Sequence, residues 1–135
     1  MENEAQITIN CDAWPIVIVK YVGDPSEDQV LDLFSEVEKS VIGRREPFAM
    51  ISDFSNGSIP DAIQRNLLAE LQSPINDAYA QYCVGEAFVA KDDMRGAFTA
   101  ILWRVKLPYP HVFVDSLDAA QEWIEERLSE HSSSA

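Results

Sequence analysis

The chain has 135 residues, which fits one domain over 1–135 with enough buried surface to fold without disulfides or metals. Hydrophobic residues (47%) and charged residues (24%) are present in ordinary proportions, but 10 basic against 23 acidic residues give a net charge of −13. This excess argues against nucleic-acid binding, because phosphates need a Lys/Arg surface, and it disfavours anionic membranes. It favours solubility, or attraction to a basic partner protein.

The sequence shows no sorting signal or membrane anchor. Residues 1–4 are acidic where a secretory signal would be basic, and no apolar run reaches the roughly 18–20 residues of a membrane span. Cys11 and Cys83 lie far apart and match no metal or redox spacing, so two reduced thiols are expected. These features predict a cytoplasmic protein without a cofactor.

The first third of the chain predicts a β-hairpin and a helix. Residues 6–10 alternate in polarity, a turn follows at 12–14, and residues 15–22 form a richer apolar strand. Ser26 precedes two acidic residues, which suits a helix N-terminus, and apolar residues then recur at helical spacing. Gly43 is the expected stop of this helix.

The middle third predicts a central strand and a broken helix. Residues 47–54 are almost continuously apolar, and 55–58 are turn residues. Ser58-Ile59-Pro60-Asp61 has the form of a capping box with an early proline, so Ser58 is the expected N-cap of the next helix. Pro74 is expected to kink or interrupt that helix, which resumes over 79–82.

The last third predicts two further strand–helix units. Residues 84–90 form a strand, and Asp92 or Asp93 caps a helix with apolar residues between 94 and 105. Residues 111–114 form the last strand.

Ser116 is expected to cap the last helix, and 1–5 and 130–135 are expected to be disordered tails. The element order is therefore β-β-α-β-α-β-α-β-α. This order predicts an α/β domain with a mixed, largely parallel sheet of about five strands and four helices.

Three segments carry a resemblance to a known family. They are Trp14-Pro15 before the second strand, Ile51-Ser52-Asp53-Phe54-Ser55, and the closing Phe113…Ala119-Ala120…Trp123-Ile124. Over about residues 6–128 the chain resembles the STAS/SpoIIAA-like domains. These include bacterial anti-sigma-factor antagonists and a looser branch with a SEC14-like fold.

The resemblance implies a bacterial, non-enzymatic regulatory or protein-interaction module. The antagonists carry a phosphorylated serine at the helix start after an Asp-x-Ser strand end, which Asp53-Phe54-Ser55 matches. The usual Asp-Ser-Ser-Gly run is replaced here by residues 56–60, and Ser58 is the nearest counterpart. The resemblance implies docking through 53–65, phosphorylation of Ser55 or Ser58, and a partner such as a kinase-type anti-sigma factor.

The same loop is a candidate anion site on physical grounds. It lies at the carboxyl end of a central strand, where open α/β sheets bind ligands, and helix N-terminal N–H groups attract anions. Asp53, Ser55 and Ser58 belong to this candidate, and Arg65 adds positive charge about one turn into the helix. The alternative is that Ser58 only caps the helix.

The helix over 94–105 is apolar on more than one side, which leaves three alternatives. Its residues are plain core, or they form a dimer or partner interface, or they cover a pocket. A pocket would make the protein a carrier or sensor of an apolar small molecule or lipid, as the SEC14-like resemblance implies. The candidate interface or pocket residues are Met94, Phe98, Trp103 and Tyr109.

No arrangement of residues predicts an enzyme. Asp92-Asp93 has the residue type for Mg²⁺, but helix capping explains both residues, so no metal site is expected. His111 and His131, the two histidines, belong to no nucleophile or zinc motif.

Overall fold

A computed structural model describes residues 5–59, 61–104 and 106–133; the side chains of 100, 103, 104, 132 and 133 are outside the description. Its sheet has five strands in the order β1-β2-β3-β4-β5. β1 runs antiparallel to β2, and the other neighbours are parallel. The strands are β1 (Gln6–Asn10), β2 (Ile16–Gly23), β3 (Phe48–Gly57), β4 (Cys83–Val89) and β5 (His111–Val114).

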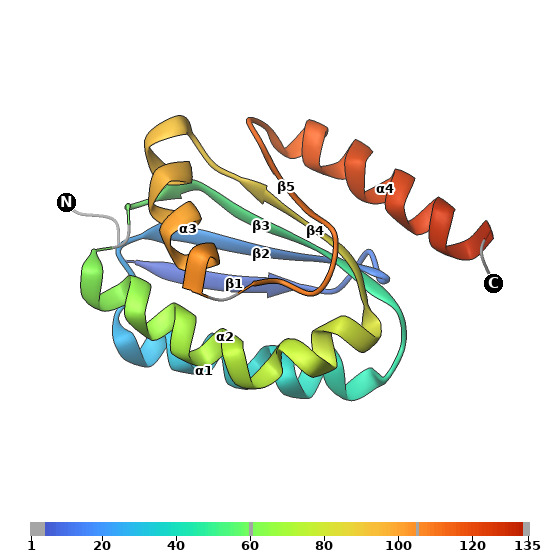
Figure 1. The fold of residues 1–135 in the computed structure, drawn as a ribbon, viewed down its shortest axis with the longest axis horizontal. Coiled ribbons are helices and arrows are strands. Elements are labelled where there is room, and N and C mark those ends of the chain that lie inside the picture. Colours follow the sequence, from blue (N-terminus) through green and yellow to red (C-terminus); the bar gives the residue numbers. More distant parts are fainter. Residues whose placement is uncertain (1–4, 60, 105, 134–135) are drawn as a thin grey trace.

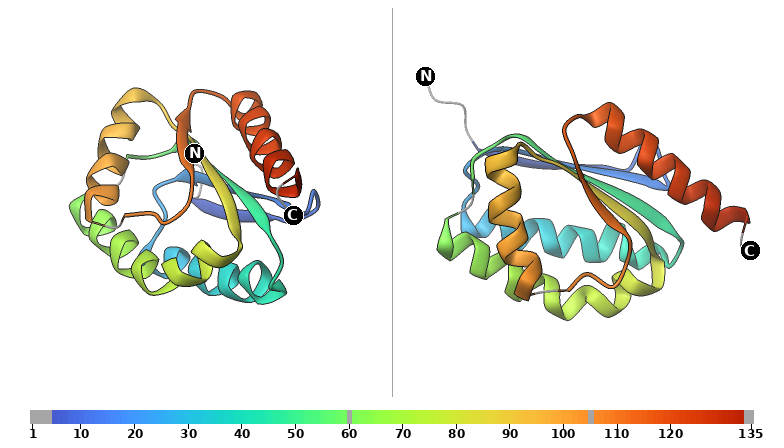
Figure 2. Two further views of the ribbon diagram at one scale, coloured as in Figure 1. Left: turned by 45° about the vertical axis from the view of Figure 1, so that its right-hand side comes forward. Right: turned by 45° about the horizontal axis from the view of Figure 1, so that its top comes forward.

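The described α-helices lie in two layers around this sheet. They are α1 (Glu27–Ser40), α2 (Ala62–Tyr82), α3 (Asp92–Arg104) and α4 (Leu117–Ser133), with a short 3₁₀ turn η1 (Ile42–Arg44) after α1. Helices α1, α2 and α3 cover one face, and α4 lies on the other (Figures 1 and 2). The predicted element order and mixed, largely parallel sheet are confirmed.

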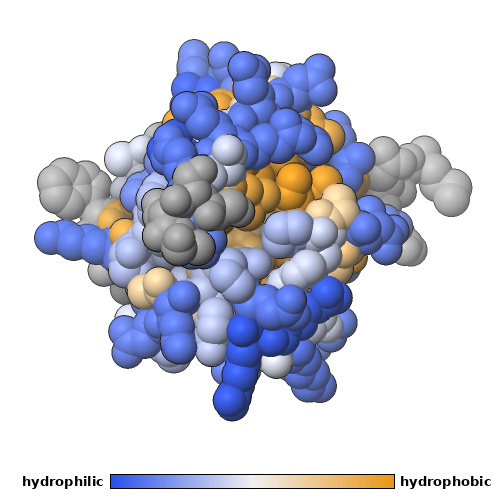
Figure 3. Space-filling view, turned by 90° about the vertical axis from the view of Figure 1, so that its right-hand side faces the viewer, coloured by the Kyte–Doolittle hydropathy of each residue, from blue (hydrophilic) through white to orange (hydrophobic). Residues whose placement is uncertain are grey.

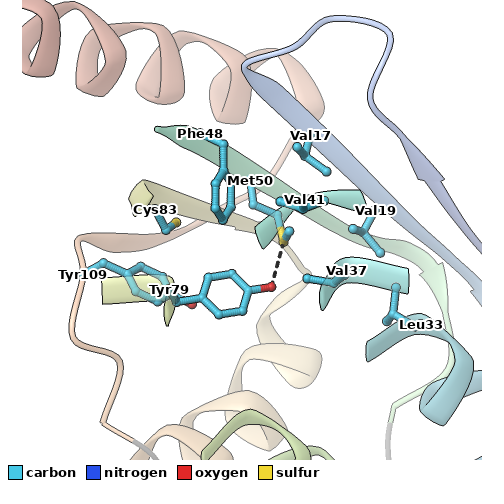
Figure 4. Packing of buried hydrophobic residues seen from close by; sticks show 10 residues of the cluster. All are labelled: Val17, Val19, Leu33, Val37, Val41, Phe48, Met50, Tyr79, Cys83 and Tyr109. Atoms are coloured by element: carbon cyan, nitrogen blue, oxygen red, sulfur yellow. Dashed lines mark hydrogen bonds between the residues drawn. The ribbon is translucent and has the colours of Figure 1, made fainter. Parts of the chain in front are cut away.

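Alternation along the buried strands gives the sheet two different cores. On the three-helix face, Phe48 and Met50 pack with residues of α1 and α2, and the Tyr79 hydroxyl lies 3.8 Å from the Met50 sulfur (Figure 4). On the other face, small and branched residues such as Ala49 and Ala87 pack against Ile124 of α4. The first core is large and aromatic, and the second is compact.

Gly85 lets α4 approach the second face closely. A Cβ atom at this position would lie 3.0 Å from the Trp123 ring and 3.2 Å from the Arg127 side chain. The absence of a side chain on this strand residue therefore sets the distance between α4 and β4.

The first helix begins as predicted but ends differently. Ser26 is its N-cap, with a capping box to Gln29. The helix ends at Ser40, before Gly43, and Gly43 lies inside η1. The left-handed residue is Arg45 (φ 54°), so the chain reverses two residues later than the glycine predicted.

Two predictions about later elements are wrong. Helix α2 continues through Pro74, so the predicted interruption does not occur, whereas the alternative of a kink stays a prediction. Pro74 is exposed, so the carbonyl that loses its helical partner is on the side where water can replace it. The chain is also helical through Ser133, not a tail from residue 130. The Ala5 carbonyl accepts a hydrogen bond from Gln29 Nε2, whereas 1–4, 134 and 135 lie outside the described residues.

Candidate functional site

The carboxyl end of β3 places Asp53 and Ser55 at the edge of the sheet. Asp53 is buried, and its Oδ1 accepts the Ser55 N–H at 3.0 Å and the Ser55 hydroxyl at 2.6 Å. The backbone therefore bends around a carboxylate whose Oδ1 already accepts two hydrogen bonds. The Ser55 hydroxyl is committed to Asp53, so a phosphate attached there would face a negative charge.

The prediction that Ser58 caps α2 is wrong. Strand β3 stays paired with β2 as far as Gly57, and the Ser58 N–H donates to the Gly23 carbonyl at 2.8 Å. The N-cap is Asp61: its side chain accepts the Gln64 N–H at 2.8 Å, and Gln64 Oε1 accepts the Asp61 N–H at 3.1 Å. Ser58 is an exposed residue between the strand and the helix.

The Asp61 cap also changes the electrostatics of the candidate anion site. A carboxylate at the N-terminus of α2 already occupies the position that a bound anion would favour. Arg65 is half-buried in the second turn of α2, where its backbone N–H donates to the Asp61 carbonyl. Anion binding at Ser58 and Arg65 stays a prediction, and it has to compete with Asp61.

Apolar side chains gather in the water-exposed part of this segment. Ile59 is 49% exposed and Ile63 is 77% exposed, the largest value among the large hydrophobic residues whose side chains are described. Ile63 lines a groove of about 460 Å³ between the start of α1 and the start of α2. The groove has Val30 and Leu67 in its wall, with Glu27, Asp61 and Glu70 as its charged residues. This segment combines an apolar hollow with an acidic rim, a feature that helical periodicity alone did not reveal.

Gln64 fixes the shape of the groove. Besides its capping bond, its Nε2 donates to the Pro25 carbonyl at 3.1 Å in the loop before α1. One side chain therefore ties the first turn of α2 to the entry of α1. The two walls of the groove are held together before any partner arrives.

The carboxyl end of β4 lies on the same edge of the sheet. There, ion pairs of Arg95 hold the following loop and helix in place. Arg95 Nε donates to the Ala90 carbonyl at 3.0 Å, and its guanidinium pairs with Asp115 and lies 4.0 Å from Asp92. The backbone N–H of Arg95 donates to the Lys91 carbonyl, and this first bond of the helix starts at Lys91. Neither Asp92 nor Asp93 is therefore the N-cap. The two aspartates lie in the first turn of α3, where carboxylates favour the helix dipole.

A buried polar cluster lies on the three-helix face. Glu86, in the middle of β4, is 7% exposed; its Oε2 accepts the Ser52 hydroxyl and its Oε1 accepts the Tyr109 hydroxyl, both at 2.7 Å. Burial raises the pKa of Glu86 above its ordinary value of 4.5, although the two hydroxyl donors and His111 act against that rise. Glu86 was not among the sequence candidates, although a charged residue inside an apolar strand is a visible signal.

The same burial affects the groups around Glu86. Desolvation first, and the Glu86 charge second, raise the pKa values of Tyr21, Tyr79, Tyr109 and Cys83 well above their ordinary range. These groups therefore stay protonated and neutral at physiological pH. The cluster joins β3, β4 and the segment before β5.

The cavity beside this cluster is small. It has a volume of about 70 Å³ and is lined by Glu86, Phe54, Phe98 and Ile101 among others. Sites for drug-sized ligands usually have about 300–1,000 Å³. A pocket lies where the carrier hypothesis places it, under α3, but its volume gives that hypothesis no support.

The residues predicted for an interface or pocket belong largely to the core. Met94, Phe98 and Tyr109 are 5%, 6% and 6% exposed, respectively. Phe98 packs at 4.2 Å, centroid to centroid, against Phe54. This burial favours the core alternative for these three residues. The Trp103 side chain lies outside the described residues.

The opposite end of the molecule shows an apolar patch framed by hydrophilic residues (Figure 3). A hollow of about 320 Å³ lies at the start of β4, between Tyr82, Pro110 and Arg127. Arg127 stacks over Trp123 with its guanidinium 5.2 Å from the ring centroid, and its terminal nitrogen pairs with Glu130 at 3.0 Å. The guanidinium therefore covers Trp123, while its buried Nε has no hydrogen-bond partner among the described residues.

Metal and acid–base chemistry find little support in the described part of the chain. There, no group of three or more His, Cys, Asp and Glu residues is arranged to hold a metal ion. His111 and His131 are exposed, and His111 Nδ1 lies 3.1 Å from the Tyr109 carbonyl. Cys11 and Cys83 are free thiols, as expected. None of the described helices is long and apolar enough to cross a bilayer.

Comparison with known proteins places this arrangement in a class of folds. No family model matches the chain, and no curated protein matches it. Several solved structures do match the chain. One is an uncharacterised DUF3478-family protein with a SpoIIAA-like fold from Shewanella loihica, with a TM-score of 0.67 and 13% identity over 92% of this chain and 98% of that one. Another is an anti-sigma factor antagonist from Mycobacterium paratuberculosis, with a TM-score of 0.57 and 15% identity over 90% and 95%.

The structure is a small α/β domain with a mixed sheet, three helices on one face and one on the other. The chain has the STAS/SpoIIAA-like fold, which confirms the resemblance inferred from its sequence. Sequence identities of 13% and 15% carry the fold and not the activity.

Proposed function

We propose that this protein is a non-enzymatic, cytoplasmic protein-interaction module that docks a partner through the segment 53–65. The observation that carries the proposal is Ile63, which is 77% exposed at the rim of the groove between α1 and α2. Ile63 adjoins Val30 and Leu67 in the lining of this groove, and a contiguous apolar surface of this kind, rimmed by polar residues, marks a protein-interaction site. A solved neighbour with the same fold is an anti-sigma factor antagonist, which supports a regulatory role of this kind.

The rim of the groove indicates the chemistry of the partner. Glu27, Asp61 and Glu70 line the groove, and no basic side chain is among the described residues that line it. A complementary surface would offer an apolar side chain to Ile63 and basic side chains to the rim. The net charge of −13 would further speed association with such a partner.

Ser58 is the proposed site of phosphoregulation. It is exposed and lies five residues before Ile63, whereas the Ser55 hydroxyl donates to Asp53. A phosphate on Ser58 would add nearly two negative charges next to the docking surface and alter partner affinity. Intact-mass and fragment mass spectrometry of protein from its own host should find phosphate on Ser58. Phosphate on Ser55, or none in any growth state, would contradict this part of the proposal.

Site-specific photocrosslinking tests the docking surface. A photoreactive amino acid replaces Ile63 in one variant and Leu117 in another; Leu117 is a matched control because it is 41% exposed in the first turn of α4. In cells of the host, the proposal predicts a discrete crosslinked partner from position 63 and none from position 117. The same partner from both positions, or none from position 63, would contradict the proposal.

A further inference from the structure

The two edges of the sheet differ in how they are protected. β5 is four residues long and follows Pro108 and Pro110, which is a common defence against unwanted strand pairing. β1 is five residues long, contains no proline, lysine or bulge, and pairs only with β2 among the described strands. One row of its backbone N–H and C=O groups therefore faces away from the sheet.

A groove of about 350 Å³ runs along this free edge. It is lined by Ile7 and Ile9 of β1 and by four residues of α1: Gln29, Asp32, Leu33 and Glu36. Ile7 and Ile9 are half-buried on the helix side of the strand, and Leu33 is buried beneath them. The groove has an apolar floor, and its charged residues are both acidic.

Helix α1 and β1 run alongside one another in the same direction (Figure 1). The bond from Gln29 Nε2 to the Ala5 carbonyl, at 2.8 Å, fixes the start of the strand against the first turns of the helix. From there the strand passes Ile7 and Ile9 while the helix passes Asp32 and Glu36. The free edge of β1 and the acidic wall formed by Asp32 and Glu36 are therefore held in fixed positions relative to each other.

The spacing of the acidic residues matches an extended chain. Asp32 and Glu36 are one turn apart, so they are separated by about 6 Å along the helix. Side chains at alternate positions of a β-strand are separated by about 6.7 Å. Lys or Arg residues at alternate positions of an added strand would lay their stems on Ile7, Ile9 and Leu33 and present their charges to the two carboxylates.

We propose that β1 and α1 form a second docking site, which accepts an extended basic segment of a partner protein as an additional strand of the sheet. Residues of that segment alternate between Lys or Arg on the helix side and small polar or β-branched residues on the other side. The second preference follows from Gln6, Thr8 and Asn10, which are exposed on the opposite side of β1. Main-chain bonds to the strand edge supply affinity, and Asp32 and Glu36 supply specificity. A second copy of this chain is a poor occupant, because its α1 would bring the same acidic wall.

The test uses an acetylated, amidated peptide of sequence KTKTKTK and a control of the same composition, KKKKTTT. In amide-resolved NMR titrations of the full chain, KTKTKTK should shift residues 6–10 and 32–36 and slow amide exchange in β1. KKKKTTT, and KTKTKTK with alternate N-methyl groups, should bind at least about fivefold more weakly. Equal binding of the two sequences, or shifts centred on 53–65, would overturn the proposal.

Paired variants separate the site from general charge attraction. Asp32→Asn with Glu36→Gln should weaken KTKTKTK binding by about fivefold or more. Asp118→Asn with Glu122→Gln removes the same charge from an equally spaced, exposed pair on α4 and should leave the affinity unchanged. An equal loss in both double variants, or dimerisation through β1 without peptide, would contradict the assignment. This test is independent of the groove at Ile63.

Discussion

Helices α2 and α4 begin in similar ways and end up with different roles. Each follows a parallel strand, each has a side-chain cap (Asp61 or Ser116), and each exposes a large apolar residue in its first turn (Ile63 or Leu117). Before α4, Asp115 is paired with Arg95, which closes the strand end. Before α2, the chain leaves the sheet after Gly57 and a groove remains open. The same local sequence rules therefore give a structural cover in one case and a candidate docking surface in the other.

The largest expected effect separates α4, which stabilises the fold, from α2, which carries the candidate docking surface. Ile124 of α4 is fully buried, so Ile124→Ala should lower the free energy of unfolding by about 2–5 kcal/mol through lost burial and a residual cavity. Ile63→Ala should change it by less than about 0.5 kcal/mol, since Ile63 is mostly exposed. Urea denaturation measures both. A large loss in Ile63→Ala would mean that this residue has a structural role.

The next effect concerns how closely α4 packs. Gly85→Ala should cost about 1–3 kcal/mol, because the added Cβ would meet the Trp123 ring at 3.0 Å. Gly96→Ala is a suitable control, since a Cβ there meets nothing within 4 Å beyond the backbone of its own helix and alanine favours the helix. Thermal unfolding of the two variants should shift in opposite directions. A neutral Gly85→Ala would show that α4 can move away from β4 without cost.

The helix caps give a smaller effect. Asp61→Ala and Ser116→Ala should each cost about 1 kcal/mol, because each leaves a first-turn N–H without its acceptor. Ser58→Ala should be neutral within about 0.5 kcal/mol, since the Ser58 side chain is not the cap. Chemical denaturation decides between these positions. A cost of about 1 kcal/mol in Ser58→Ala, with a neutral Asp61→Ala, would reverse the assignment.

The two faces of the sheet also differ in pH response, because Glu86 is buried on the face that α2 covers. Its folded pKa is raised above 4.5, so the folded state binds this proton more tightly than the unfolded state. The Glu86 contribution is therefore fully present below pH 4.5 and is lost as pH rises through the folded pKa. The stability of Glu86→Gln relative to the native chain should grow over that window, by about 1.4 kcal/mol per unit of pKa shift. A pH-independent difference between the two proteins would contradict the raised pKa.

Sequence patterns predicted the elements well where local signals were sufficient. Ser26 and Ser116 were predicted as caps, and each lies within three residues of the strand end before it. Ser58 was wrong because long-range pairing with β2 extends β3 to Gly57, and because Asp61 and Gln64 form a competing box. Local sequence preferences cannot show whether a residue such as Ser58 follows a strand extended by pairing or caps the next helix.

The candidate site was predictable in position and not in detail. The carboxyl end of β3 follows from the strand order, and Asp53 and Ser55 lie there. The exposure of Ile63 was not predictable, because Ile63, Leu67 and Leu71 share the spacing of a buried helical stripe. Only the position of α1, fixed by the Gln64–Pro25 bond, shows which of these residues is left uncovered.

The most direct test of the docking surface is the affinity of the partner captured from position 63 for purified variants. Isothermal titration compares the native chain, Ile63→Ser and Leu117→Ser. Loss of a central apolar contact should weaken binding at least about tenfold in Ile63→Ser, and Leu117→Ser should match the native chain. Equal affinities for Ile63→Ser and the native chain would contradict docking through the α1–α2 groove.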